Sequence, residues 1–315
     1  MRRSGVWLAT NQWSWAAAGS LILWLIASLL SHHISTGLLL INMTLASFLV
    51  LVGLGQMVVV TSGDGSFDLS LPYVVTLSAF VSGVVMSGSN GKLFVAILAG
   101  IGAAIVVGLC NGMIIGALKV PPVIATLATG YIAYSIILEL SGTSEGLPAR
   151  GFRSFALAQF HGISPVTIIA IGFCLLMFVV LARSRFGYYL AAMGQGRRAA
   201  RLAVIPVTRM VLLSFALSAL MGGVAGVLLD GFDGGAFFSM GDPYLLGPLG
   251  AVVIGGTLIS GGRWSVAGTM AGGLFLTLLV TVMEISKLPI GYEDLAEGLV
   301  VIGFVIAASV VRVSP

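Results

Sequence analysis

The sequence has 315 residues, of which 58% are hydrophobic and only 8% are charged. A soluble domain carries about 25% charged residues, so this composition excludes a water-soluble protein and predicts an all-α polytopic membrane protein in a lipid bilayer. The net charge of +4 does not indicate nucleic-acid binding, because the Lys and Arg residues lie beside apolar segments, as they do at the cytoplasmic ends of membrane spans.

A membrane span needs about 20 mostly apolar residues, and on this rule we count about ten in one domain that covers residues 1–315. Some are expected to be short or broken, because the eighth is rich in glycine and a polar interruption separates the second from the third. The expected spans are 14–32, 38–60, 70–87, 93–117, 122–140, 164–182, 210–229, 246–260, 265–285 and 293–311.

The distribution of Lys and Arg predicts the orientation. If both termini are cytoplasmic, eleven of the fifteen Lys and Arg residues fall inside. The largest cytoplasmic loop is then 183–209, and no acidic residue lies between Glu145 and Asp230 to balance its charge. It contains Arg183, Arg185, Arg197, Arg198, Arg201 and Arg209. The non-helical loop 141–164 and the acidic segment with Asp230, Asp233 and Asp242 are expected outside.

Small residues recur every four positions in several spans. This spacing lets two helices approach closely in a membrane, so we expect tight packing along these stripes. The stripes are Ala104, Gly108, Gly112 and Gly116; Gly222 and Gly226; and Gly268 and Gly272.

Polar residues inside a membrane are costly and often functional. The segment TSGDGSFDLSLPY, Thr61–Tyr73, includes Asp64, Asp68 and Pro72 between two apolar runs. Such a run breaks a helix, and the freed backbone is tolerated only inside the protein or beside a wet cavity. The other interpretation is a plain cytoplasmic loop with two solvated aspartates.

Four further polar residues lie in or near the spans: Asn42, Gln56, Asn111 and Glu139. Each either lines a polar pathway or makes a hydrogen bond across helices.

The sequence lacks the common catalytic patterns. None of its three histidines, His32, His33 and His161, belongs to an HExxH motif, and no GxxxxGK[ST] motif is found, so a P-loop ATPase is excluded. Cys110 and Cys174 lie in apolar runs and are expected in the core. We therefore expect no catalytic residue, no metal and no cofactor, and any ATP hydrolysis must occur on a separate partner subunit.

Four stretches resemble the permease subunits of bacterial ABC importers for ribose and related monosaccharides, in the wider group that includes branched-chain amino acid permeases. The resemblance covers about residues 53–300. Its stretches are GQMVVVTSGDGSFDLS (55–70), NGMIIGALKVPPVIATLAT (111–129), FGYYLAAMGQGRRAARLAVIPV (186–207) and GPLGAVVIGGTLISGGRWSVAGTMAGG (247–273).

The resemblance implies a type II ABC importer-like permease in the bacterial inner membrane. It implies two ATP-binding cassette subunits, a second permease copy or a paralogue, and a periplasmic solute-binding protein as partners. It also implies that loop 183–209 couples to the ATPase, through Gly187, Gly194, Arg197, Arg198, Ala199, Ala200, Arg201 and Leu202. The candidate residues of the translocation pathway are Gln56, Asp68, Asn111 and Thr126.

Two features depart from the family pattern. Arg197 and Arg198 stand where acidic or amide residues are usual, and Asp64-Gly65-Ser66 is an additional segment.

A pathway of neutral residues suits an uncharged sugar or polyol. The alternative is an ion-coupled secondary transporter that uses Asp68 or Glu139. A membrane enzyme is disfavoured, because no nucleophile–base pair is visible.

Overall fold

The computed structural model describes residues 13–31, 36–143, 146–289, 291–292, 295–300 and 302–303. Helices form the regular structure of these residues, apart from one isolated antiparallel bridge between Phe160 and Ile163. The prediction of an all-α membrane protein is confirmed.

Within the described residues, seven helices are long and apolar enough to cross a membrane. Many of their large apolar side chains point outward, as lipid contact requires; Leu175, for example, is 63% exposed. The seven are α2 (Trp13–Leu30), α3 (Thr36–Thr61), α5 (Leu93–Gly116), α6 (Pro122–Thr143), α8 (Pro165–Arg183), α11 (Val207–Asp233) and α13 (Val266–Ile285).

Two further apolar helices, α4 (Leu71–Met86) and α12 (Gly247–Ile254), are too short to cross alone. They correspond to the third and eighth predicted segments, although α12 covers only half of the expected 246–260. The tenth predicted segment, 293–311, lies largely outside the described residues.

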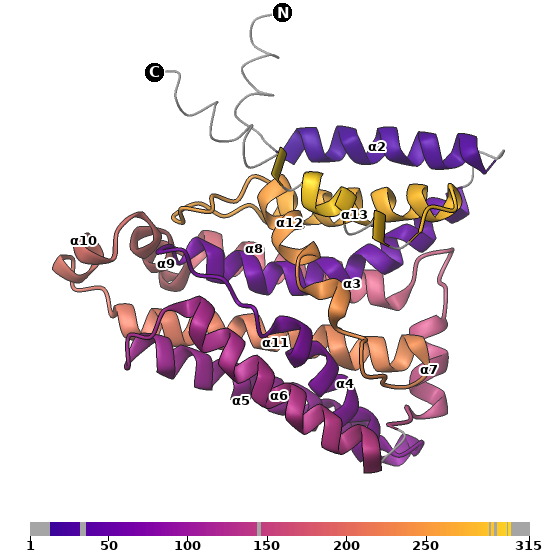
Figure 1. The fold of residues 1–315 in the computed structure, drawn as a ribbon, viewed down its shortest axis with the longest axis horizontal. Helices are drawn as coiled ribbons and strands as arrows, with labels where there is room; N and C mark the ends of the chain where they lie inside the picture. Colours follow the sequence, from indigo (N-terminus) through magenta and orange to yellow (C-terminus); the bar gives the residue numbers. More distant parts are fainter. Residues whose placement is uncertain are drawn as a thin grey trace, which may run out of the picture.

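The two ends of the bundle carry different short helices (Figure 1). α9 (Arg185–Gln195) and α10 (Arg197–Leu202) lie at one end, and α7 (Arg150–Leu157) lies at the other. The prediction that 141–164 is non-helical is wrong where α7 forms. Phe152 and Ala156, one helical turn apart, are buried against Gly231 of α11, so packing stabilises this helix.

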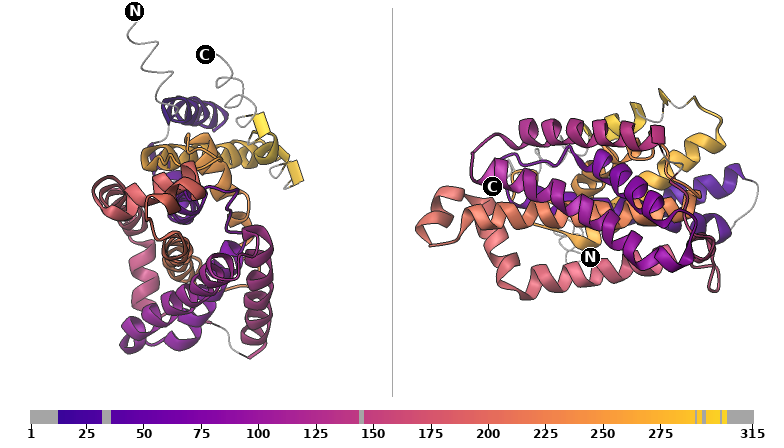
Figure 2. Two further views of the ribbon diagram at one scale, coloured as in Figure 1. Left: turned by 90° about the vertical axis from the view of Figure 1, so that its left-hand side faces the viewer. Right: turned by 90° about the horizontal axis from the view of Figure 1, so that it is seen from below.

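α11 is the central helix, in contact with α3, α4 and α5. The view along the bundle shows α2 outside α13, on the side away from α5 and α6 (Figure 2). The predicted small-residue packing is confirmed. Gly108 and Gly112 lie against α11, Gly226 lies against Val75 of α4, and Gly272 lies against Ala251 of α12. A side chain at any of these positions would collide with the backbone of the neighbouring helix.

Two crossings of the bundle are discontinuous, and they run in opposite directions. After α3, residues 62–70 turn back into the bundle, and α4 then runs to the α7 end, where Gly88 N–H donates to Leu147 O over 3.1 Å. After α11, residues 234–246 return from the α7 end. α12 then leads to a loop at the other end, where Gly262 N–H donates to Thr61 O over 2.9 Å.

The two breaks meet inside the bundle. Gly241 packs directly on the Pro72 carbonyl at the start of α4, and a side chain there would collide with it. The expectation that the acidic segment lies outside stays a prediction, and the structure separates the members of this segment. Asp242 lies next to this contact at the depth of the helix break, whereas Asp233 ends α11 at the α7 end.

Candidate translocation and coupling sites

Asp68 lies in the break between α3 and α4. Three successive residues with positive φ, Gly63 (76°), Asp64 (62°) and Gly65 (65°), reverse the chain just after α3, which explains why glycine is needed here. The reversal carries the following residues back into the protein, and Asp68 is only 3% exposed.

The Asp68 carboxylate accepts three hydrogen bonds. Ser70 donates to one oxygen through its N–H (3.1 Å) and its hydroxyl (2.6 Å), and the Ser218 hydroxyl of α11 donates to the other (2.9 Å). The Asp68 N–H in turn donates to Gln56 Oε1 of α3 over 3.2 Å. A buried carboxylate with this many donors is a stable component of the fold.

The network continues into α5 and α6. The Asn111 amide donates to the Ser70 hydroxyl over 2.9 Å, and the Thr129 hydroxyl donates to the Asn111 carbonyl. One connected set of hydrogen bonds therefore joins four helices to the break: α3, α5, α6 and α11.

Three of the four predicted pathway residues, Gln56, Asp68 and Asn111, belong to this network. The Thr126 side chain is buried but is not part of this network, because its hydroxyl donates to Pro122 O of its own helix over 2.9 Å. All four are at most 3% exposed, so they are packed inside this chain and do not line an open channel. They can line the translocation pathway only if this region moves, and so they remain candidates.

Sequence reasoning missed three members of the network: Ser70, Thr129 and Ser218. Ser70 closes the Asp-Leu-Ser motif, and its position two residues after Asp68 is a signal that could have been used. Ser218 lies on α11, far away in the chain, and no local pattern distinguishes it from Ser214, the other serine of that helix.

The intramembrane amide Asn42 has a packing role. Its side-chain carbonyl accepts a hydrogen bond from the Thr281 hydroxyl over 2.7 Å, which links α3 to α13. This is the interhelical bond that one interpretation of such residues predicts.

The predicted coupling segment forms α9 and α10. Arg198, Ala199, Arg201 and Leu202 are exposed on α10, and Leu202 is 85% exposed. Ala200 is buried. Gly187 lies against the Leu181 carbonyl and Gly194 against the Thr61 carbonyl, so both glycines are needed for close packing within this chain.

Unlike these exposed residues, the Arg197 side chain contacts residues of this same chain. Its guanidinium lies 3.3 Å from the Asp64 carboxylate and donates to the Ser66 hydroxyl over 3.1 Å. Burial lowers the pKa of Arg197 and the Asp64 charge raises it, and an arginine stays protonated at neutral pH. Asp64 and Ser66 belong to the additional segment that distinguishes this chain from the pattern it resembles, so the two departures contact each other.

The ion pair borders a cavity of ≈ 530 Å³ at the α9–α10 end. Lys119, Arg198 and Arg201 line it together with Arg197, and Asp64 is its acidic member. The cavity lies between the turn that joins α5 to α6 and the start of α11. Movement of α10 would change its shape directly.

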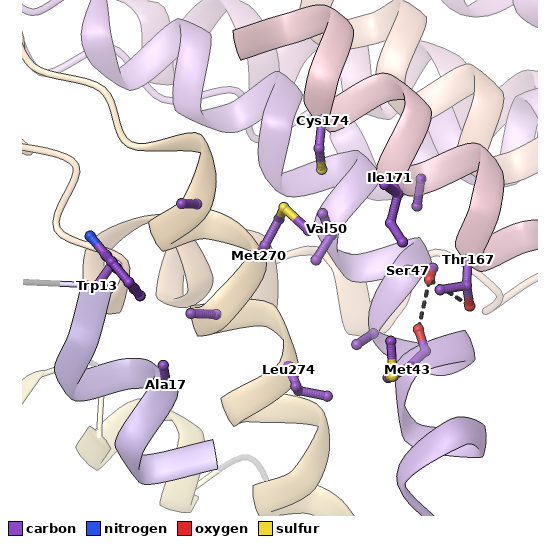
Figure 3. Close-up of a pocket in the computed structure, with 14 residues that line it drawn as sticks. Trp13, Ala17, Met43, Ser47, Val50, Thr167, Ile171, Cys174, Met270 and Leu274 are labelled. Carbon is purple, nitrogen blue, oxygen red and sulfur yellow. Dashed lines mark hydrogen bonds between the residues drawn. The ribbon is translucent and has the colours of Figure 1, made fainter. Parts of the chain in front are cut away.

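An apolar cavity of ≈ 310 Å³ lies elsewhere, between α2, α3, α8 and α13 (Figure 3). Val50, Cys174 and Met270 point into it. Its few polar groups bond to one another, since the Ser47 hydroxyl donates to Thr167 over 3.2 Å. This lining offers nothing to bind a hydroxylated solute.

Comparison with known proteins agrees with the resemblance to ABC importer permeases that the sequence shows. Residues 38–310 match the family model described as "Branched-chain amino acid transport system / permease component". The chain is 29% identical over 278 residues to the Autoinducer 2 import system permease protein LsrC of Salmonella choleraesuis, which covers 88% of this chain and 79% of that protein.

Two sugar-import permeases are similarly related. The Ribose import permease protein RbsC of Bacillus subtilis is 30% identical over 256 residues, 80% of this chain and 78% of that protein. The L-arabinose transport system permease protein AraH of Escherichia coli is 30% identical over 260 residues, 81% of this chain and 77% of that protein.

Proposed function

Because the chain belongs to the branched-chain amino acid transport system permease component family, we propose that it is the transmembrane subunit of an ATP-driven importer. Its solute is a small neutral sugar or polyol, which a periplasmic binding protein delivers and which passes into the cytoplasm. The chain is a multi-pass membrane protein and is not itself an ATPase. The names of the relatives, which cite ribose, L-arabinose and autoinducer 2, support this solute class.

The partners in this proposal are two ATP-binding cassette subunits, a second permease copy or paralogue, and the solute-binding protein. The ATP-binding subunits dock at the α9–α10 end. The arginines gathered at that end support a cytoplasmic location for it, and this proposal places both termini on the same side in the bacterial inner membrane. The exposed Leu202 and Val204, 85% and 88% exposed, offer apolar contacts beside the positive charges of Arg198 and Arg201.

The observation that carries the proposal is the direct connection between α10 and the helix break. Arg197 bonds to Asp64 and Ser66, and Gly194 packs on the backbone at Thr61 and Gly262. A movement of α9 and α10 therefore pulls on both discontinuous crossings at once. These meet where the Asp68 network is buried, so nucleotide-driven movement at one end can open or close the middle of the bundle.

The alternative is an ion-coupled secondary transporter, and the buried Asp68 carboxylate is the observation in its favour. Three hydrogen-bond donors satisfy this carboxylate in the closed fold, and Glu139 lies far along α6 toward the α7 end. The protein's own donors thus already satisfy the Asp68 carboxylate, which favours the importer over an ion-coupled transporter.

Reconstitution separates these functions. The tagged chain is purified from native membranes, and its bound proteins are identified by mass spectrometry. We expect a P-loop ATPase in about equal amount, and uptake into proteoliposomes that requires ATP and a solute-binding protein. Uptake by this chain alone, abolished by a protonophore, would instead establish a secondary transporter.

A further inference from the structure

One exposed surface of the protein is unsuited to lipid. A chain of aromatic rings runs along α4 and α6 to the segment after α11. The ring centroids of Tyr73 and Tyr131 are 6.0 Å apart, those of Tyr73 and Tyr134 are 5.8 Å apart, and those of Tyr134 and Phe238 are 4.9 Å apart. We name these four residues the aromatic face.

The aromatic face lies near the middle of the helix bundle. Tyr73 follows the helix break by a few residues, and Tyr131 is near the middle of the 22-residue helix α6. Asp242 stands beside the contact between Gly241 and Pro72, and Pro72 is the residue that precedes Tyr73. The short 3-10 helix η2 (Asp242–Tyr244), which begins with Asp242, contacts α4.

The face is open and polar. Tyr131 is 60% exposed, Phe238 is 39% exposed, and Asp242 is exposed as well. In hydrocarbon, a phenol or a carboxylate without a hydrogen-bond partner costs several kcal/mol. An exposed carboxylate among tyrosines at this depth is therefore expected to border water and not lipid chains.

The aromatic face also adjoins the buried network. A side chain at Gly130, between Thr129 and Tyr131, would meet the Tyr73 ring at 2.7 Å and the Ser70 backbone at 3.4 Å. The rings thus cover the region where Ser70, Asn111 and Thr129 are hydrogen-bonded, and any opening of the two broken crossings would occur beside them.

We infer that the aromatic face and Asp242 form the solute-binding surface of the translocation pathway. This inference rests on the proposed importer function and specifies its solute contacts. The ligand class is a neutral ring with several hydroxyl groups. Its apolar C–H face stacks on the Tyr73 and Tyr131 rings, while its hydroxyls bond to the phenols and donate to the Asp242 carboxylate.

Thiol labelling tests whether the face is wet, whatever the solute. Tyr131→Cys and, as a matched control, Ile132→Cys are made in a background with Cys110 and Cys174 replaced by alanine. Ile132 is the next residue of α6 and is 62% exposed on a different side of that helix. In membrane vesicles, we expect a charged methanethiosulfonate reagent to modify Tyr131→Cys at least about tenfold faster, because the reactive thiolate forms only in water.

Equal rates at the two positions would overturn the inference, because Tyr131 would then face the same surroundings as its lipid-exposed neighbour. This result would leave the importer function intact, since that function is tested by the associated ATPase. A fast reaction at Tyr131→Cys in a protein that binds no ATPase would instead reject the proposed function and support a pathway of another kind.

Uptake of D-ribose and L-arabinose by the full importer tests the solute contact. One aromatic contact is worth about 0.5–1.5 kcal/mol, so Tyr131→Leu is expected to slow uptake by roughly two- to twelvefold. Tyr131→Phe, which keeps the ring, is expected to lose less, and Ile132→Ala should transport like the wild type. Wild-type rates for Tyr131→Leu and Asp242→Asn would overturn the assignment.

Discussion

The guanidinium of Arg197 lies 3.3 Å from the carboxylate of Asp64, and this ion pair ties α10 to the break between α3 and α4. The Asp64 side chain is 66% exposed, whereas that of Arg197 is 19% exposed. The pair joins the segment that we propose to receive force from an ATPase to the segment that leads to the buried Asp68. We expect the pair to matter for transmitting movement from α10 to the break. An ion pair with one exposed partner contributes at most about 1 kcal/mol to stability.

Arg197→Ala is therefore expected to uncouple the importer without unfolding it. Uptake and the stimulation of ATP hydrolysis by the loaded binding protein should fall by roughly fivefold or more, while the melting temperature in detergent stays nearly unchanged. Arg183→Gln removes an exposed arginine from the same end and serves as the control. Normal stimulation in Arg197→Ala would show that force passes through other contacts.

Gly194→Ala is expected to destabilise the protein. The added methyl would collide with the Thr61 carbonyl and with the backbone of Gly262, and such overpacking costs about 1–3 kcal/mol. Gly196→Ala is the matched control, because the nearest neighbour of the added methyl would be Ala199 Cβ at 4.0 Å and the Gly196 backbone is extended (φ 171°). Thermal unfolding in detergent measures both variants, and equal melting temperatures would contradict the packing described here.

Asp68→Ala should be among the more damaging substitutions in the break. It leaves the N–H and hydroxyl of Ser70 and the hydroxyl of Ser218 without their acceptor. Each buried donor left unsatisfied lowers the free energy of unfolding by about 1–3 kcal/mol. Asp68→Asn retains one acceptor oxygen and should be milder. The yield of folded protein and its melting temperature report the difference, and equal losses would indicate that the carboxylate charge itself is required.

The Asp68→Asn variant also distinguishes the two transport mechanisms. An asparagine cannot carry a proton, so a secondary transporter that uses Asp68 would lose its dependence on the proton gradient. For an ATP-driven importer, we expect uptake by Asp68→Asn to remain ATP-dependent and insensitive to a protonophore. Proteoliposome uptake with and without the protonophore measures this directly.

Leu202→Glu and Ala199→Glu test the proposed docking surface. Both residues are exposed on α10, so the substitutions should leave folding unchanged. A carboxylate at an apolar contact costs several kcal/mol, and the ATPase should no longer co-purify with the chain. Arg185→Glu changes the charge at the start of α9 and should retain the ATPase. Retention by Leu202→Glu would exclude α10 as the docking element.

Composition and apolar segment length were enough to predict an all-helical membrane protein and nine of its helices. The reason is that a bilayer satisfies no backbone hydrogen bond, so long apolar segments must be helical. The small-residue stripes likewise predicted close helix packing, because small residues at every fourth position let two helix backbones approach each other closely. Loop 141–164 was misjudged, since α7 depends on a contact with Gly231 that no local pattern reveals.

Only the tertiary structure decided how the polar residues are used. The sequence showed that Asp64 and Asp68 interrupt a span, but both a loop and a buried break were possible. The fold separates them, leaving Asp64 at the surface for Arg197 and burying Asp68 among donors from Ser70 and Ser218. Two of these partners, Arg197 and Ser218, lie far from the break in the chain. Hydrogen bonds and ion pairs act over about 3 Å, and only folding brings such distant residues that close.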